Sequence, residues 1–141
     1  MTDSIISGIV SYLEQCPLLG EGLIRVDCLG PDPVEYSVDV LPVNPVVQTY
    51  INGASIRQYL FAVSSRESYG LDLIENMNHS GFYEQLGEWF ERQSAEKNFP
   101  DIGEGKKVQT IETVTSGYLL ATDGKTARYQ IQIRIVFFKE A

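Results

Sequence analysis

The chain has 141 residues, with 11 Lys and Arg against 19 Asp and Glu, so its net charge is −8. This length suits one domain with its own hydrophobic core, and a hydrophobic fraction of 43% is ordinary for a folded protein. Nucleic-acid backbones and anionic membrane surfaces are both bound through clustered Lys and Arg, so the acidic balance argues against both as main ligands. We expect a single domain over residues 1–141, without specific nucleic-acid binding and without membrane attachment.

The first part of the chain predicts one helix followed by short strands. Residues 3–15 place their apolar side chains on one helical stripe, and Pro17 ends that pattern. Alternating apolar and polar residues then predict strands, at 23–28, 34–40, 46–51 and 56–64. Between the last two, Asn52-Gly53 predicts a hairpin turn because both residues tolerate positive φ.

The second part predicts a helix and two long strands. The helical region runs over residues 71–96 and is expected to break at 78–81, where Asn, His, Ser and Gly follow one another. After a loop at 97–106, strands are expected at 107–120, bent at Ser116-Gly117, and at 127–138, with a turn at Asp123-Gly124. The last strand carries two distinct faces. One is apolar (Tyr129, Ile131, Ile133, Ile135 and Phe137) and the other polar (Arg128, Gln130, Gln132 and Arg134).

The order of these elements indicates the fold class. Helices and groups of strands follow one another without βαβ alternation, and hairpins predominate. We therefore expect an α+β fold, with a mainly antiparallel sheet packed by an N-terminal helix and a central, broken helix.

Candidate catalytic and metal-binding residues are few. His79 is the only histidine, so it lacks companions for a metal site, and it falls in the expected helix break. Glu84, Glu88 and Glu91 share one helix face and are expected to be solvated rather than to bind metal. Trp89, with Phe82 and Phe90, could floor a ligand pocket, but the helical spacing favours core packing. We expect neither an enzyme nor a bound cofactor or metal.

The two cysteines are expected to be free thiols. Cys16 and Cys28 both lie beside apolar residues, which is typical of buried cysteine. The alternative, a disulfide between them, requires an oxidising compartment. Met1-Thr2-Asp3-Ser4 carries no positive charge of the kind that begins a secretory signal, so we expect a cytoplasmic protein.

Isolated arginines on the predicted strands are the candidate interface residues. Arg57, Arg66, Arg128 and Arg134 are isolated positive charges on polar strand faces of an otherwise acidic chain. Such strand faces can simply be solvated, or they can contact acidic surfaces of sister subunits. Long strands at a sheet edge also favour coverage by another chain. We therefore expect these four arginines at a subunit interface.

Several segments together resemble a family of short proteins. They are 59–66 (YLFAVSSR), 82–84 (FYE), 89–91 (WFE), 115–120 (TSGYLL) and 127–134 (ARYQIQIR). The family is encoded in the head-to-tail gene clusters of long-tailed bacteriophages and of prophages in Gram-positive bacteria. Its members look like minor capsid or tail-terminator proteins. The resemblance spans about 60% of the chain, residues 56–138.

This resemblance implies a homo-oligomeric ring, commonly six-fold, that caps the tail tube and meets the head connector. Assembly would take place in the cytoplasm of the bacterial host, and the product would be a virion or a phage-like particle. An acidic ring would not hold the DNA that passes through it. Two other functions remain open: a small ligand- or peptide-binding module, and a small transferase, for example of acyl groups. The family offers no signature of ring contacts that transfers residue by residue.

Overall fold

The computed structural model describes residues 4–19, 24–26, 35–68, 73–115, 117–122 and 126–141. Within them lie two helices and seven strands of one sheet, which confirms the predicted α+β class. The helices are α1 (Ile5–Glu14) and α2 (Leu73–Ala95). The strands are β1 (Ile24–Val26), β2 (Glu35–Leu41), β3 (Val46–Thr49), β4 (Ser55–Ser68), β5 (Lys106–Thr113), β6 (Tyr118–Thr122) and β7 (Thr126–Lys139).

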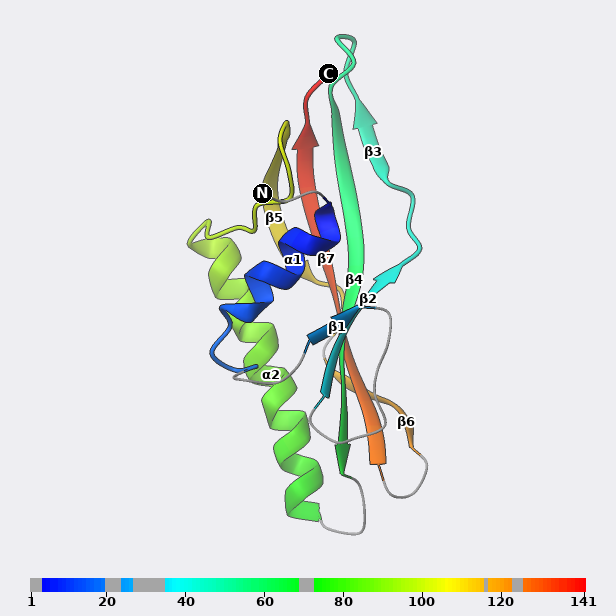
Figure 1. The fold of residues 1–141 in the computed structure, drawn as a ribbon, viewed down its shortest axis with the longest axis vertical. Helices are drawn as coiled ribbons and strands as arrows, with labels where there is room; N and C mark the ends of the chain where they lie inside the picture. Colours follow the sequence, from blue (N-terminus) through cyan, green and yellow to red (C-terminus); the bar gives the residue numbers. More distant parts are fainter. Residues whose placement is uncertain (1–3, 20–23, 27–34, 69–72, 116, 123–125) are drawn as a thin grey trace.

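Two long strands form the centre of the sheet. β4 and β7 each have 14 residues and pair antiparallel over their whole length, from Ser55 opposite Lys139 to Ser68 opposite Thr126. β2 and β3 follow one another along the other side of β4, while β5 and β6 do the same along β7. β1 pairs with β2 in parallel, and the other described pairings are antiparallel, as predicted. Figure 1 shows β4 and β7 running through most of the long axis of the molecule.

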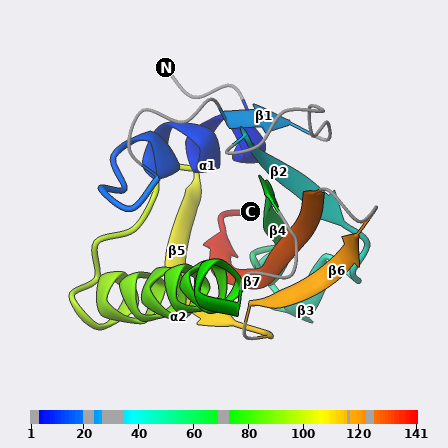
Figure 2. The same cartoon turned by 90° about the horizontal axis from the view of Figure 1, so that it is seen from below.

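One face of the central pair forms the hydrophobic core. The apolar positions predicted in β7 are all buried, and so are Phe61 and Val63 of β4. Because side chains alternate between the faces of a strand, residues paired across β4 and β7 share a face. Figure 2 shows α1 and α2 on the same side of this pair. We call the side covered by the helices the inner face, and the opposite side the outer face.

The short helix α1 is fixed by its cap and by aromatic packing. Ser4 is the N-cap, and its side chain and that of Ser7 form a capping box. The buried side of α1 includes Ile9 and Leu13, which were predicted to pack on the sheet. Tyr12 lies with its ring centroid 5.3 Å from that of Trp89, and its hydroxyl donates a hydrogen bond to the carbonyl of Asn98 at 2.7 Å. These contacts join α1 to α2.

Helix α2 is continuous, so the predicted break at residues 78–81 is wrong. Asn, His and Ser cost a helix well under 1 kcal/mol each relative to Ala, and Gly costs about 1 kcal/mol, whereas Pro costs about 3 kcal/mol. This run contains no proline, and the helix is stabilised further along by packing. The buried side of that later part includes Tyr83, Leu86, Trp89 and Phe90. Tyr83 takes the position expected for Phe82, which is only partly buried.

Two predicted turns decide how the strands follow one another. At the β3–β4 hairpin, Gly53 has φ +92°, and its amide donates to the carbonyl of Tyr50 at 3.0 Å. At the predicted bend near Gly117, the expected strand at 107–120 divides into β5 and β6. A Cβ atom on Gly117 would lie 2.2 Å from Cβ of Tyr83, so only glycine fits there. The predicted turn at Asp123-Gly124 lies outside the described residues.

Candidate assembly surfaces

A polar network lies on the outer face where β2, β4 and β7 run side by side. The carboxylate of Asp39 accepts hydrogen bonds from the hydroxyl of Ser37 at 2.7 Å and of Ser64 at 3.2 Å. It also accepts one from Nη2 of Arg128 at 2.9 Å. The hydroxyls of Ser37 and Ser64 are fully buried, which makes these bonds stronger than their exposed equivalents. The network therefore links three strands across the outer face.

The second predicted arginine on β7 also has a partner within the chain. Arg134 forms an ion pair with Glu112 of β5, and its Nε donates to the Glu112 carboxylate at 2.9 Å. Both side chains are more than 40% exposed. Solvent screens such a pair, so it contributes little to stability. Like Arg128, Arg134 is therefore not an isolated charge.

The two arginines of β4 lie on opposite faces. Arg57 sits opposite Phe137, on the inner-face register near the end of the sheet, and its Nε donates to the hydroxyl of Ser55 at 3.0 Å. Arg66 sits at an outer-face position, opposite Arg128 in the register, and its side chain lies outside the described part. The four arginines predicted at an interface thus do not share one face.

Sequence reasoning missed the acidic partners of these arginines. Asp39 and Glu112 occupy polar positions in alternating strands, so both were readable as outer-face residues. Which strand lay beside which was not readable, because Asp39 and Arg128 are 89 positions apart. The pairing of β2 with β4, and of β4 with β7, is what brings these two together.

The other candidate residues have structural surroundings. Trp89 and Phe90 are buried in the core, as the helical spacing favoured. Cys16 is a buried free thiol, and burial raises the pKa of that thiol, which disfavours the reactive thiolate. Cys28 lies outside the described residues, and His79 falls within α2. In the described part of the chain, no three His, Cys, Asp or Glu residues are grouped so that they could hold a metal ion.

Helix α2 and the neighbouring strand ends enclose a groove of about 390 Å³. We call it the α2 groove; its lining residues include Glu84, Gly87, Glu88, Glu91, Val114 and Ile131. The three glutamates are exposed, as predicted, but they border a hollow rather than an open helix surface. A Cβ atom on Gly87 would make ordinary van der Waals contact with Ile131, at 3.5 Å, so the approach of α2 to the sheet does not require glycine there.

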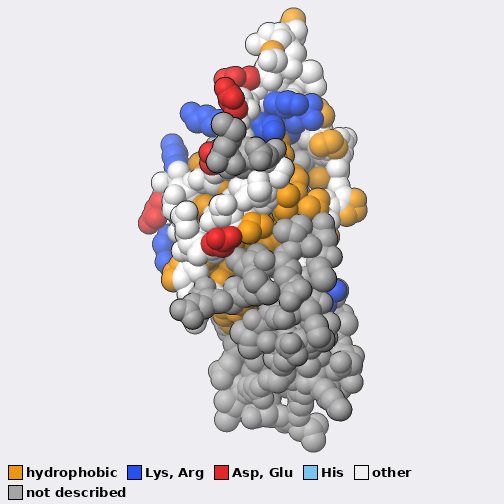
Figure 3. Space-filling view, viewed as in Figure 1, with side chains coloured by type: hydrophobic (Ala, Val, Ile, Leu, Met, Phe, Trp, Pro, Cys, Tyr) orange, Lys and Arg blue, Asp and Glu red, His pale blue; other side chains and the backbone are white. Residues whose placement is uncertain are grey.

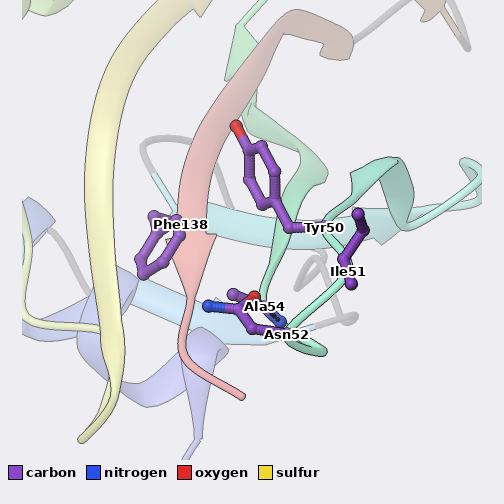
Figure 4. A pocket seen from close by; sticks show the side chains of 5 residues that line it. All are labelled: Tyr50, Ile51, Asn52, Ala54 and Phe138. Carbon is purple, nitrogen blue, oxygen red and sulfur yellow. Dashed lines mark hydrogen bonds between the residues drawn. The ribbon is translucent and has the colours of Figure 1, made fainter.

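The β3–β4 hairpin projects as an apolar arm. We define the arm as residues 43–57, which comprise β3, the turn and the start of β4. Tyr50 and Phe138 border a hollow of about 600 Å³ near its end, with ring centroids 6.4 Å apart. Figure 4 shows the two rings as neighbours, tilted by 45°, with Ile51 on the far side of Tyr50 from Phe138. Ile51 is fully exposed, at 109%, so its large aliphatic side chain lies in water.

The outer strands carry irregularities that discourage edge-to-edge pairing. β3, β5 and β6 each contain a register shift against their partner strand, after Val46, Val108 and Leu119. A bulge of this kind interrupts the row of backbone groups that another chain would need for pairing. These edges are therefore poorer templates for strand pairing, while the two longest strands, β4 and β7, lie in the centre of the sheet.

Comparison with known protein families and with curated protein sequences gives no match to this chain. The resemblance to phage minor capsid and tail-terminator proteins therefore stays a prediction. Neither described helix is long and apolar enough to cross a membrane.

Proposed function

We propose that this protein is a structural assembly subunit, which associates with copies of itself into a closed ring. The ring would be a tail terminator or a head–tail joining component of a phage or prophage particle. The tail-tube protein and the head connector would be its partners there.

The observation that carries the proposal is the exposed apolar arm. Soluble monomers rarely keep several large apolar side chains together in water, and such groups commonly mark protein contacts. Val43, Val47, Tyr50 and Ile51 are between 37% and 109% exposed, and all lie on this one projecting segment. In Figure 3 the tip at the top of the molecule carries apolar and uncharged atoms, with charged side chains below it. A binding partner would remove these side chains from water.

The direct test is the mass of the purified protein in solution. We expect native mass spectrometry and light scattering to show a discrete oligomer that grows with protein concentration. Electron microscopy of the same sample should show closed rings. A monomer at every concentration would contradict a self-assembling subunit.

A ligand- or peptide-binding module is the second candidate, favoured by the hollow between Tyr50 and Phe138. An open apolar hollow of about 600 Å³ is within the size range of small-molecule sites. A ligand screen by thermal shift on the monomeric protein separates the two candidates, because a bound ligand raises the unfolding temperature as its concentration rises.

A further inference from the structure

The charges of this acidic protein are unevenly distributed. From Val40 to Ser65 the chain contains no Asp or Glu, and Arg57 is its one charged residue. This stretch includes the whole arm. The α2 groove, in contrast, is bordered by Glu84, Glu88 and Glu91. At a net charge of −8, two copies repel one another over most of their surface, but not where the arm of one meets the acids of the other.

The exposed apolar side chains lie mainly on the arm and in the α2 groove. Among the residues whose side chains the structure describes, six large apolar side chains are exposed. Four of them are on the arm and a fifth, Val40, precedes it. The sixth is Val114, which is 49% exposed and lines the α2 groove. Arm and groove therefore match one another both in apolar surface and in charge.

We propose that the arm of one copy docks in the α2 groove of a second copy. This contact rests on the proposed ring and identifies the surfaces that would form it. Ile51 and Val47 would cover Val114 and the aliphatic floor provided by Ile131. Arg57 would approach the glutamates at the border of the groove, where opposite charges favour the correct partner and orientation.

The location of the two surfaces makes the contact directional. The arm projects at one end of the molecule, and the middle of α2 lies well away from it (Figure 1). Each copy that docks its arm therefore keeps its own groove free for the next copy. Such head-to-tail contacts close into a ring when the rotation between neighbours divides a full turn, and otherwise continue as a filament.

Crosslinking between two single variants tests the contact directly. Ile51→Cys and Val114→Cys would each be made in a background in which Cys28 is changed to Ser, and Cys16 is buried. A short bis-maleimide should give a strong dimer band when the two variants are mixed, and several-fold less with either variant alone. The matched control replaces Val114→Cys with Gln109→Cys, an exposed position on β5 outside the groove. An equally strong band with the control would overturn the proposal.

Charge and polarity variants test the same contact by its energy. Ile51→Asp and Glu88→Arg should each raise the apparent dissociation constant of the oligomer at least ten-fold. Gln109→Asp and Glu96→Arg introduce the same charged residues at exposed positions away from both surfaces, and they should leave the dissociation constant within two-fold. Circular dichroism would establish that each variant is folded. Arg57→Glu combined with Glu88→Arg should recover part of the lost association.

The results of these experiments distinguish a failure of the docking proposal from a failure of the proposed ring. If the unmodified protein forms rings and Ile51→Asp and Glu88→Arg form them equally well, the docking proposal is wrong and the ring stands. If the unmodified protein is a monomer at every concentration and the mixed cysteine variants do not crosslink, both are wrong.

Discussion

The two faces of the β4–β7 pair share one backbone register but have different chemistry. On the inner face, Ile131, Ile133 and Ile135 are at most 1% exposed and pack against apolar side chains. On the outer face, the same strand presents Arg128 and Arg134, each paired with an acid from a neighbouring strand. The alternation of side chains along an extended chain is sufficient to produce both faces.

The difference suggests a division of roles between the faces. Burial of apolar surface is the dominant favourable term in folding, so the inner face supplies most of the stability. Ion pairs at partly exposed positions contribute little, so the outer face mainly fixes which strands lie together. Truncation of a buried side chain on the inner face should therefore cost more than loss of an exposed ion pair on the outer face.

The largest effect is expected for Ile133→Ala, at the centre of the inner face. Ile133 is fully buried, and its truncation removes apolar contacts and leaves a cavity. We expect the free energy of unfolding to fall by about 2–5 kcal/mol, measured by chemical denaturation. Ile133→Val, which removes one methylene group, should cost about 0.5–1.5 kcal/mol. Equal costs for both variants would show that the core relaxes around the gap.

A slightly smaller loss is expected for Gly117→Ala, because it overfills the inner face. The new methyl group would lie 2.2 Å from Cβ and 2.6 Å from Cγ of Tyr83, which is buried. Tyr83 cannot turn away easily, since its hydroxyl lies within hydrogen-bond distance of the Ser65 hydroxyl and donates to the carbonyl of Tyr129. We expect a loss of roughly 1–3 kcal/mol in denaturant melts.

The control for this prediction relieves the crowding. Adding Tyr83→Gly to Gly117→Ala should cost less than the sum of the two single changes, because the clash disappears with Cβ and the ring of Tyr83. If the two losses of stability simply add, contact with Tyr83 is not the source of the strain.

An intermediate effect is expected for Asp39→Ala on the outer face. The Asp39 side chain is 17% exposed and accepts from Arg128, Ser37 and Ser64. Removal of the carboxylate leaves Arg128 without this ion pair in a partly buried position. We expect a loss of about 1–3 kcal/mol, measured by thermal and chemical unfolding. Asp39→Asn keeps an acceptor oxygen and should cost less; the reverse order would contradict an acceptor role.

The sequence predicted both faces well but not their partners. The alternation in β7 identified Ile131, Ile133 and Ile135 as core and Arg128 and Arg134 as outer-face residues, and the structure confirms both sets. Periodicity depends on local geometry, so it is readable from one strand. The pairing of Arg128 with Asp39 depends on strand order, which periodicity does not encode.

Dependence on tertiary packing also explains the error about α2. A run of Asn, His, Ser and Gly has weak helix propensity, but α2 continues through it because packing outweighs propensity. The pair Asn52-Gly53 predicted that the arm is a hairpin, but it did not predict that the apolar side chains of the arm are exposed. The sequence signal that distinguishes the arm is the absence of Asp and Glu from Val40 to Ser65.

The smallest stability effect is expected for Arg134→Glu, where the two hypotheses about the interface diverge. Arg134 and Glu112 are both more than 40% exposed, so their pair contributes at most about 1 kcal/mol, and two acids side by side should cost a similar amount. The protein should therefore stay folded.

Its effect on assembly discriminates between the outer face and the arm. If assembly uses the arm and the α2 groove, the oligomer measured by native mass spectrometry should persist in Arg134→Glu. If assembly uses the outer-face arginines, as the strand pattern predicted, the oligomer should weaken. The charge swap Arg134→Glu with Glu112→Arg restores the ion pair within the chain. Recovery of the oligomer in the swap would mean that Arg134 acts through Glu112, whereas continued loss would mean that a neighbouring subunit contacts Arg134 itself.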